Sequence, residues 1–287
     1  MAISLDEIRR RIVTALFSDD ELFDQLVLKG GNALQLIHGI SNRASVDIDF
    51  SLEGDFEDIQ FAGSRIKSAL EREFRNVDLI VIDFEIRAKP PELKDGQPQW
   101  WGGYLVNFKL CSREVFEQHG DDLQMLRRRS EVLGPNQKRT FKVDISKYEY
   151  CNGKERRELD SYTLYAYSLE MILLEKLRAI CQQMEDYPHN NHRRPRPRDF
   201  FDIWQILQSE EEGIELASKE STELAKNIFN AKDVQMSLLK QIESTRAFHA
   251  ADWPSVELSV QGHSEPFDYY FDFVVELVRD LQTGWEI

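Results

Sequence analysis

The spacing of apolar residues changes near residue 160, and this change constrains the fold more than any other feature of the chain. Before it, LIVIDFEIR at 79–87 and FKVDIS, which contains Asp144, have the alternation and β-branched content of strands. After it, YSLEMILLEKLRAICQQM at 167–184 has helical spacing, with Ser168 as its predicted N-cap. Strands grouped in one half and helices in the other are typical of an α+β fold.

The first half also contains helical patterns, so we expect a small mixed sheet with helices there. The predicted helices are 5–16, 32–40, 57–73 and 114–130, and the predicted strands are 46–52, 79–87, 103–112 and 139–148. The second half is predicted to be helical over 167–184, 199–247 and 267–282, with a basic, proline-rich loop at 187–198. We therefore predict two domains, 1–160 and 161–287.

Charge and cysteine content limit the classes of function. The formal net charge of −15 argues against broad nonspecific nucleic-acid binding, although a local basic patch remains compatible with it. Three widely spaced cysteines without a CxxC pair predict neither a disulfide framework nor a zinc site, and they favour a reducing, cytoplasmic location. The apolar runs are too short for a membrane span, so we expect no membrane partner. The histidines show no zinc-binding spacing, and no phosphate-binding Walker motif or nucleophile elbow occurs.

The strand predicted at 46–52, VDIDFSL, carries two carboxylates. Because side chains at i and i+2 share a face of a strand, Asp47 and Asp49 project together. Two adjacent like charges repel, and a divalent cation such as magnesium relieves the repulsion with oxygen ligands. An isolated acid pair of this kind is more often a solvated strand face, so its neighbours decide the interpretation.

Three neighbours favour a site that handles phosphate. Gly30 and Gly31 open a predicted helix, where backbone N–H groups can bind phosphate. Ser45 precedes the acid strand and offers a hydroxyl, and Asp144 adds a third carboxylate from another predicted strand. Carboxylates that hold metal ions beside a triphosphate are typical of phosphoryl-transfer enzymes.

These residues carry a resemblance to a known family. KGGNAL, followed by RASVDIDFSL from Arg43 to Leu52, resembles the first motif of the polymerase-β-like nucleotidyltransferase superfamily. More narrowly, it resembles the AbiEii-type toxins of toxin–antitoxin and phage-defence systems. The resemblance implies a nucleotidyltransferase core followed by a helical lobe that completes the nucleotide site. It also implies that Gly30 and Gly31 bind nucleotide phosphate, and that Asp47 and Asp49 bind Mg²⁺. Asp144 matches a less regular third metal ligand.

The helical half contains two further matches to this family. They are the lysine of YSLEMILLEKLRAI, Lys176, and the acids of RPRDFFDIWQIL, Asp199 and Asp202. From the residues alone, Lys176 either extends to solvent or faces an anion, and Asp199 can simply favour a helix N-terminus. The resemblance implies that Lys176 contacts nucleotide phosphate and that Asp199 orients it or takes part in catalysis. The roles of Asp202 and of the arginine loop from Arg193 to Arg198 stay open.

The family resemblance implies a specific reaction. The expected activity is transfer of a nucleoside monophosphate from an NTP to an RNA acceptor, the tRNA 3′ end above all, which arrests growth and calls for a cognate antitoxin. The acidic composition keeps open an alternative in which a protein or small molecule is nucleotidylated. A non-catalytic protein that binds a partner through the same fold is a third hypothesis.

Overall fold

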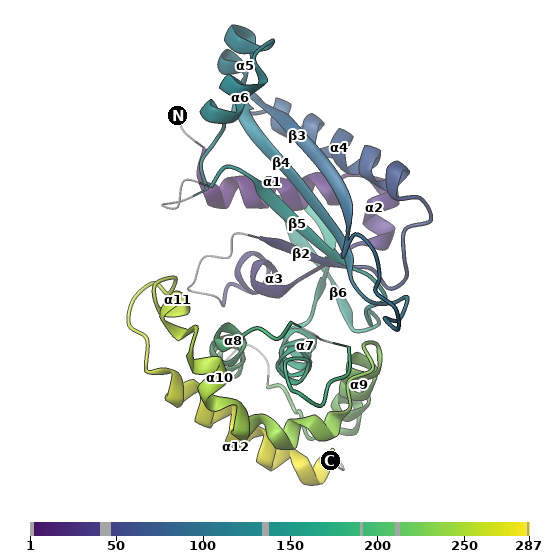
Figure 1. Cartoon of the computed structure of the whole chain (residues 1–287), viewed down its shortest axis with the longest axis vertical. Helices are drawn as coiled ribbons and strands as arrows, with labels where there is room; N and C mark the ends of the chain where they lie inside the picture. The colour runs from purple at the N-terminus through teal and green to yellow at the C-terminus, as the bar shows by residue number, and fades with distance from the viewer. Residues whose placement is uncertain (1–2, 41–46, 134–137, 190–191, 210–212, 286) are drawn as a thin grey trace. The chain divides into compact units, whose positions relative to one another are not determined.

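The computed structural model describes residues 3–40, 47–133, 138–189, 192–209, 213–285 and 287 (Figure 1). The chain divides into two compact units. The first consists of Met1–Ile37, Ser45–Cys151 and Glu155–Ala166, and the second of His38–Ala44, Asn152–Lys154 and Tyr167–Ile287. The predicted assignment of 1–160 to a nucleotidyltransferase core and 161–287 to a lobe that completes the nucleotide site stays a prediction.

A seven-stranded mixed sheet organises the first unit, which confirms the predicted α+β class. Its strands are β1 (Val27–Lys29), β2 (Ile48–Ser51), β3 (Leu79–Lys89), β4 (Gly103–Ser112), β5 (Phe141–Ser146), β6 (Lys154–Leu159) and β7 (Tyr162–Tyr167). They lie in the order β3-β4-β5-β2-β1-β7-β6. β2 runs parallel to β5 and antiparallel to β1, and β1 runs parallel to β7. The acid strand therefore lies inside the sheet.

Two amphipathic helices, α1 (Leu5–Phe17) and α4 (Ile59–Arg75), pack against each other, and α4 packs against β3 (Figure 1). The contact with the sheet is close, because a Cβ atom added at Gly63 of α4 would lie 2.5 Å from Ile86 Cγ2. Phe74 of α4 also lies against Phe108 of β4, with ring centroids 6.3 Å apart. These contacts identify the face of β3 and β4 that the helices cover.

Short helices complete the first unit, with bounds that differ from the prediction. They are α2 (Asp20–Gln25), α3 (Gly30–Leu36), α5 (Arg113–His119) and α6 (Leu123–Arg129). The helix predicted at 32–40 begins at Gly30 and ends at Leu36, and Gly39 beyond it has a left-handed φ of 66°. The helix predicted at 114–130 is two helices, because the Asp122 carboxylate caps a new start by accepting from the Met125 N–H.

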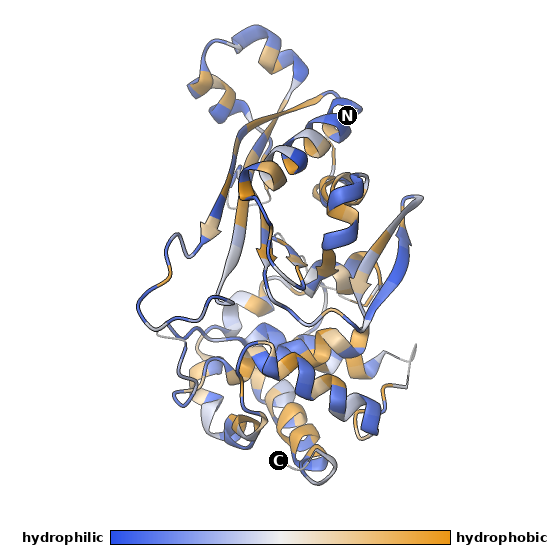
Figure 2. Ribbon diagram, turned by 90° about the vertical axis from the view of Figure 1, so that its right-hand side faces the viewer, coloured by the Kyte–Doolittle hydropathy of each residue, from blue (hydrophilic) through white to orange (hydrophobic). Residues whose placement is uncertain are grey.

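The hairpin of β6 and β7 was not predicted. β6 has the sequence KERREL, which lacks the apolar alternation of a half-buried strand (Figure 2). It lies at the edge of the sheet, where charged side chains are tolerated and discourage pairing with other chains. Its composition therefore reflects its edge position.

The second unit is helical, as predicted. Its elements are α7 (Leu169–Cys181), α8 (Pro197–Gln208), α9 (Lys219–Asn230), the 3₁₀ helix η1 (Met236–Thr245), α10 (Arg246–Ala250), α11 (Trp253–Glu257) and α12 (Phe267–Gly284). Aromatic packing joins α8 to α12, with the rings of Phe200 and Phe271 stacked at 5.1 Å and Phe201 meeting Tyr270 edge to face. None of the helices in the described ranges is long and apolar enough to cross a membrane.

Candidate active site

The two acids of the DID sequence lie on one face of the sheet. Ile48 and Phe50, which alternate with them, are 1% and 0% exposed, whereas Asp49 is half-buried and Asp47, just before β2, is exposed. The apolar residues point into the core and hold the strand, so the carboxylates point away from it. This is the orientation that the alternation predicts.

The sheet places two more charged residues beside Asp49. In the strand register, Asp49 is directly opposite Lys29 of β1 and Asp144 of β5. Directly opposed residues point to the same face, so Lys29, Asp49 and Asp144 form one row across three strands, roughly 4.8 Å apart from strand to strand. The sequence could predict the strands that carry these residues, but not that their registers align.

Gly30 packs against the carboxylate of Asp49. Its φ of 66° lies in the left-handed region, which an L side chain rarely adopts, and a Cβ at this position would lie 2.8 Å from Asp49 Oδ2. Glycine therefore leaves room for the carboxylate and turns the chain from β1 into α3. Gly31 follows as a buried residue of α3. α3 has only seven residues, so its dipole lends little support to the predicted binding of phosphate by Gly30 and Gly31. The support comes instead from the left-handed conformation of Gly30.

Two contacts that the sequence did not single out support the same row. The buried amide of Asn32 donates from Nδ2 to the backbone carbonyl of Asp47 at 2.6 Å, and thus fixes the start of the acid strand. Lys29 and Glu149 form a buried ion pair with 3.4 Å between Nζ and Oε1. Neither partnership has a sequence signal, because both depend on contacts between distant segments.

Asp144 has a cationic partner. Lys89, the last residue of β3, donates from Nζ to both carboxylate oxygens of Asp144 at 2.7 and 2.9 Å. The side chains are 56% and 28% exposed, so water screens the pair. The assignment of Asp144 as a third metal ligand stays a prediction.

The residues present fit a divalent cation. Asp47 and Asp49 supply hard carboxylate oxygens from one face, and Gly30, which has no Cβ, leaves room for the Asp49 carboxylate. Magnesium is commonly held by one or two carboxylates together with substrate phosphates, so this pair suffices. Within the described ranges, no group of three or more histidine, cysteine or acidic side chains could enclose a metal ion without a substrate.

The second unit contains a buried charged cluster around Lys176 of α7. Its Nζ donates to Asp199 Oδ1 at 3.1 Å and to Asp202 Oδ2 at 2.6 Å, and the Arg196 guanidinium also pairs with Asp199. Of the two alternatives that the sequence left open, solvent or an anion, the structure shows Lys176 facing two carboxylates. Two cations and two carboxylates balance in charge, which is what a buried cluster requires. The catalytic and phosphate-binding roles of Lys176 and Asp199 stay predictions.

Electrostatics in this cluster keep Asp199 ionised. Burial alone would raise the pKa of its carboxyl, but the charges of Arg196 and Lys176 outweigh burial and hold the pKa below its usual value. His249 of α10, which the sequence analysis did not single out, accepts the backbone N–H of Arg196 on Nδ1 at 3.0 Å. Burial lowers the pKa of His249 to about 4, although the Asp199 carboxylate acts in the opposite direction. His249 is therefore a neutral acceptor that fixes the start of α8.

The remaining candidates are less informative. Ser45 and Arg43 lie outside the described residues. In the arginine loop, Arg193 pairs with Glu185 at 2.9 Å. Arg127, in the last turn of α6, is exposed and pairs with Asp83 at 2.7 Å.

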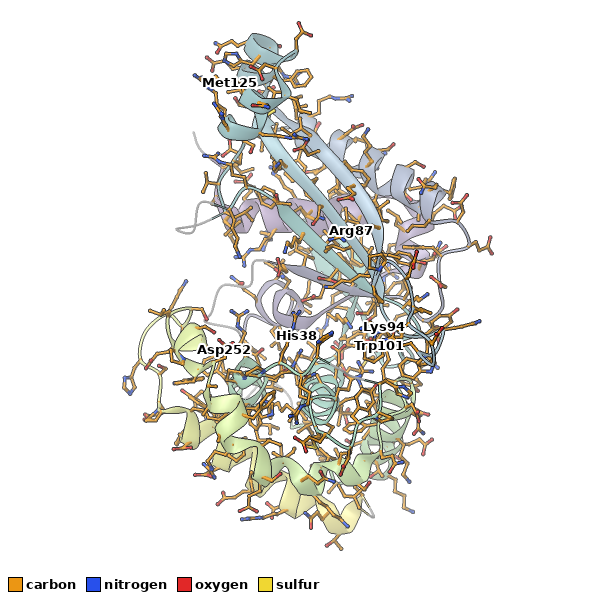
Figure 3. The ribbon with its side chains drawn as sticks, viewed as in Figure 1. His38, Arg87, Lys94, Trp101, Met125 and Asp252 are labelled. Atoms are coloured by element: carbon orange, nitrogen blue, oxygen red, sulfur yellow. The ribbon has the colours of Figure 1, made fainter. Side chains whose placement is uncertain are left out.

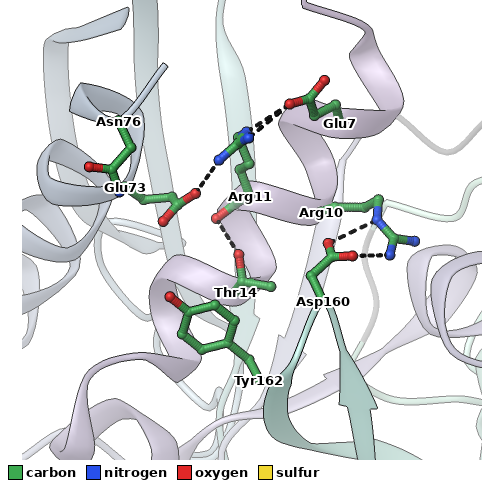
Figure 4. A pocket seen from close by; sticks show the side chains of 8 residues that line it. All are labelled: Glu7, Arg10, Arg11, Thr14, Glu73, Asn76, Asp160 and Tyr162. Atoms are coloured by element: carbon green, nitrogen blue, oxygen red, sulfur yellow. Dashed lines mark hydrogen bonds and ion pairs between the residues drawn. The ribbon is translucent and has the colours of Figure 1, made fainter. Parts of the chain in front are cut away.

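A separate cavity of about 500 Å³ lies in the first unit (Figure 4). Its two arginines are already matched by carboxylates, since Arg10 pairs with Asp160 and Arg11 contacts Glu7 and Glu73. These ion pairs tie α1 to α4 and to the β6–β7 turn. The cavity is lined by Glu7, Arg10, Arg11, Thr14, Glu73, Asn76, Asp160 and Tyr162. An anionic ligand would have to displace these carboxylates, so we assign the cavity no role in nucleotide binding.

Two solved structures share the fold. JHP933 from Helicobacter pylori is 19% identical, with a TM-score of 0.51, over 98% of this chain and 91% of that protein. A nucleotidyltransferase candidate from H. pylori is also 19% identical, with a TM-score of 0.52, over 97% and 95% of the two chains. At this identity the likeness concerns the fold alone. No curated protein sequence matched.

A family model matches most of the chain. The model, described as nucleotidyl transferase AbiEii toxin of a type IV toxin–antitoxin system, matches residues 11–274. That range contains the acid row, Gly30 and the Lys176 cluster. It extends beyond the quoted motifs into α12, so the helical second unit also belongs to the matched region.

Proposed function

Because that match spans residues 11–274, the chain belongs to the AbiEii nucleotidyltransferase toxin family, and we propose that it transfers a nucleoside monophosphate from an NTP to RNA. Nucleotidyl transfer and an antitoxin partner follow from membership of the family, as the sequence predicted. The proposal adds a magnesium requirement and an acceptor, the tRNA 3′ end. Growth arrest and a role in phage defence are the proposed consequences of modifying that end.

The row of charged residues in the first unit is the observation that carries the proposal. Asp49 and Asp144 share a face on adjacent strands, and Gly30, at the end of β1, packs against the Asp49 carboxylate. Buried Ile48 and Phe50 hold the carboxylates on a rigid strand. A solvated strand face would require neither a left-handed glycine against the acid nor an asparagine that fixes the start of the strand.

Asp47 and Asp49 would hold the magnesium ion. When bound, the ion would neutralise charge on the triphosphate and lower the pKa of the attacking hydroxyl. Gly30 and Gly31 would bind nucleotide phosphate through backbone N–H groups, and Ser45 would add its hydroxyl. Lys176 would contact phosphate, with Asp199 orienting it, while Asp202 balances the charge of the buried cluster.

The reaction is an in-line displacement at the α-phosphate. The oxygen of a ribose hydroxyl at the RNA end forms a bond to the α-phosphorus, and the bond from the α-phosphorus to the bridging oxygen of the β-phosphate breaks. The hydroxyl proton passes to solvent, and pyrophosphate leaves with the bonding electrons. The protein contributes position and charge, which supply most of the catalysis in phosphoryl transfer.

The test is a transfer assay with each α-labelled NTP, a tRNA transcript and magnesium. We expect label in the tRNA with at least one NTP, and its loss in the double variant Asp47→Asn, Asp49→Asn. The matched control is Asp24→Asn, Glu57→Gln, which removes two exposed carboxylates outside the acid row and should transfer as the unchanged protein does. Absence of label with every NTP, or full transfer by the Asp47, Asp49 variant, would contradict the proposal.

The net charge of −15 favours a second candidate, in which the acceptor is a protein or a small molecule. A negatively charged chain repels RNA unless cations gather locally. The same assay in a cell extract distinguishes the two, because label in protein or in a small product, with none in RNA, would select the second candidate.

A further inference from the structure

Three exposed cations lie on the same sheet face as the acid row in the first unit. They are Arg87 (labelled in Figure 3) and Lys89 of β3, and Lys142 of β5. We refer to these three residues as the cationic strip. A contact on the opposite face of the sheet shows which way these side chains point. Ile86 of β3 lies against Gly63 of α4. Because side chains alternate along a strand, Arg87 and Lys89 point away from that helix.

Strand register connects the strip to the acids. Asp49 is opposite Asp144, Asp144 is opposite Leu105 of β4, and Leu105 is opposite Arg87. With strands about 4.8 Å apart, the backbone of Arg87 lies about 14 Å from that of Asp49 along one row. Lys142 lies two residues before Asp144 on the same face, and Lys89 reaches Asp144 directly.

The cations of the strip are poorly neutralised. Among the residues that the structure describes, Arg87 and Lys142 have no ion-pair partner, and Lys89 has only the exposed pair with Asp144. By contrast, Lys109 of the same sheet shares Asp83 with Arg127. Glu85 bounds the strip, one row beyond Arg87 on the same face. What distinguishes the strip is its place, because its cations share one sheet face with the acid row, where phosphate groups could bind them.

The order of the strands separates this strip from the predicted triphosphate site. Gly30, at the end of β1, lies on one side of Asp49, whereas β5, β4 and β3 lie on the other. An NTP held at Gly30 would present its α-phosphate to the acids from the β1 side. The attacking hydroxyl has to arrive from the opposite direction in an in-line displacement, which is the side of the strip.

We propose that the cationic strip binds the phosphate backbone of the RNA acceptor and that Asp144 orients Lys89 for this contact instead of binding metal. The inference rests on the proposed function, because it assumes an RNA acceptor. Arg87 and Lys142 are binding residues, and Asp144 is a positioning residue that acts through Lys89. The contacts of Lys89 Nζ with both oxygens of Asp144, at 2.7 and 2.9 Å, place the ammonium beside the acid row.

Binding of a 5′-labelled tRNA transcript tests the strip without catalysis. We would measure the affinity by fluorescence anisotropy with EDTA, at several salt concentrations, for Arg87→Met, Lys89→Met and Lys142→Met. Each variant should bind the transcript about fivefold more weakly at low salt. Each should also reduce the slope of log affinity against log salt by about 0.7, the value for one lost contact with a single-stranded phosphate. The KM for NTP should stay within twofold of that of the unchanged protein.

Lys67→Met is the matched control. Lys67 is 50% exposed, close to the 56% of Lys89, and pairs with Glu71 on α4, the helix on the opposite face of the sheet. It should bind the transcript as the unchanged protein does. If the strip variants bind tRNA like Lys67→Met, or if they raise the KM for NTP instead, the inference is wrong.

Asp144 is tested by a double-mutant cycle and by metal titration. If Asp144 orients Lys89, then Lys89→Met should weaken RNA binding less in an Asp144→Asn background than in the unchanged protein. The magnesium concentration for half-maximal transfer should be within twofold of normal in Asp144→Asn. Additive effects, or a tenfold higher magnesium requirement, would overturn the positioning role.

Failure of the inference and failure of the proposed function give different results. If the unchanged protein neither binds the transcript nor transfers a nucleotide to it, the proposed function is wrong. If it does both while the strip variants remain indistinguishable from Lys67→Met, only the inference is wrong.

Discussion

Gly30 lies so close to Asp49 that a Cβ at position 30 would stand 2.8 Å from Asp49 Oδ2. We therefore expect Gly30→Ala to push the carboxylate out of place and to lower kcat for nucleotidyl transfer by about 100-fold, the cost that a displacement of about 1 Å can carry. The left-handed conformation adds a folding cost of about 1–2 kcal/mol for any L side chain. Transfer kinetics and urea unfolding would measure the two effects.

Gly39→Ala is the control for that variant. Gly39 has the same φ of 66°, but a Cβ there would meet nothing within 4 Å. The Gly39→Ala variant should lose about as much stability as Gly30→Ala but keep its transfer activity. Equal losses of activity in the two variants would show that backbone strain, not the contact with Asp49, causes the effect.

Lys176→Met should destabilise the second unit strongly. The substitution leaves Asp199 and Asp202 buried without their shared cation, and removing one partner of a buried ion pair costs about 3–5 kcal/mol. Arg279→Met, which removes an exposed partner of Glu243, should change the free energy of unfolding little. Urea denaturation, monitored by tryptophan fluorescence, would compare the free energies of unfolding of the two variants.

The same Lys176 variant tests the phosphate role. Where Lys176→Met remains folded at low temperature, its affinity for NTP should fall at least tenfold. Unchanged NTP affinity in the folded variant would leave Lys176 with a structural role alone.

Acidification should destabilise the protein through His249. Its pKa is lowered to about 4 in the folded state, so between pH 6.5 and 4 the unfolded state binds a proton that the folded state does not. Stability therefore falls as the pH falls, by about 3 kcal/mol over that range. Asp199, whose folded pKa is also lowered, contributes in the same direction only below its unfolded pKa of about 3.9.

His249→Asn isolates this effect. Its amide oxygen can accept the Arg196 N–H but does not titrate, so the free energy of unfolding should depend less on pH between 6.5 and 4.5. His263→Asn, which alters a side chain that is 85% exposed, should leave the pH dependence as it is. The midpoints of urea unfolding, measured at several pH values, would show this difference. If the midpoint changed equally with pH in the unchanged protein and in His249→Asn, the prediction would be wrong.

The three cysteines should be inert in the native protein. Cys111, Cys151 and Cys181 are buried thiols, and burial raises the thiol pKa of Cys111 and Cys181. We expect no reaction with an aromatic disulfide reagent under native conditions and three equivalents in denaturant. Rapid reaction of a thiol in the folded protein would be inconsistent with this structure.

Local patterns could predict much of the fold. The alternation in VDIDFSL gives the face of Asp47 and Asp49, and the apolar spacing around Lys176 gives a buried helix. These features depend on neighbours a few residues apart, so a single sequence contains them. The α+β class, the family and the nucleotidyltransferase activity were predicted from such patterns together with the motif resemblance, and all three are confirmed.

Contacts between distant segments could not be predicted in the same way. The pairing of Asp144 with Lys89, 55 residues away, depends on sheet order and register. The same holds for Asn32 on Asp47 and for His249 on Arg196, neither of which has a distinctive spacing. The β6–β7 hairpin was missed because KERREL obeys the rules of an exposed edge and not those of a buried strand.

That edge has a consequence for the behaviour of the protein at high concentration. Five of the six residues of β6 are charged, two acidic and three basic, so the strand itself is nearly neutral although the chain is strongly acidic. A second copy that approached this edge in β-sheet register would have to desolvate charges of both signs. Colloidal stability here thus comes from the local mixture of charges, and replacing the lysine and arginines by threonine or valine would invite fibrillar assembly while making the protein more acidic.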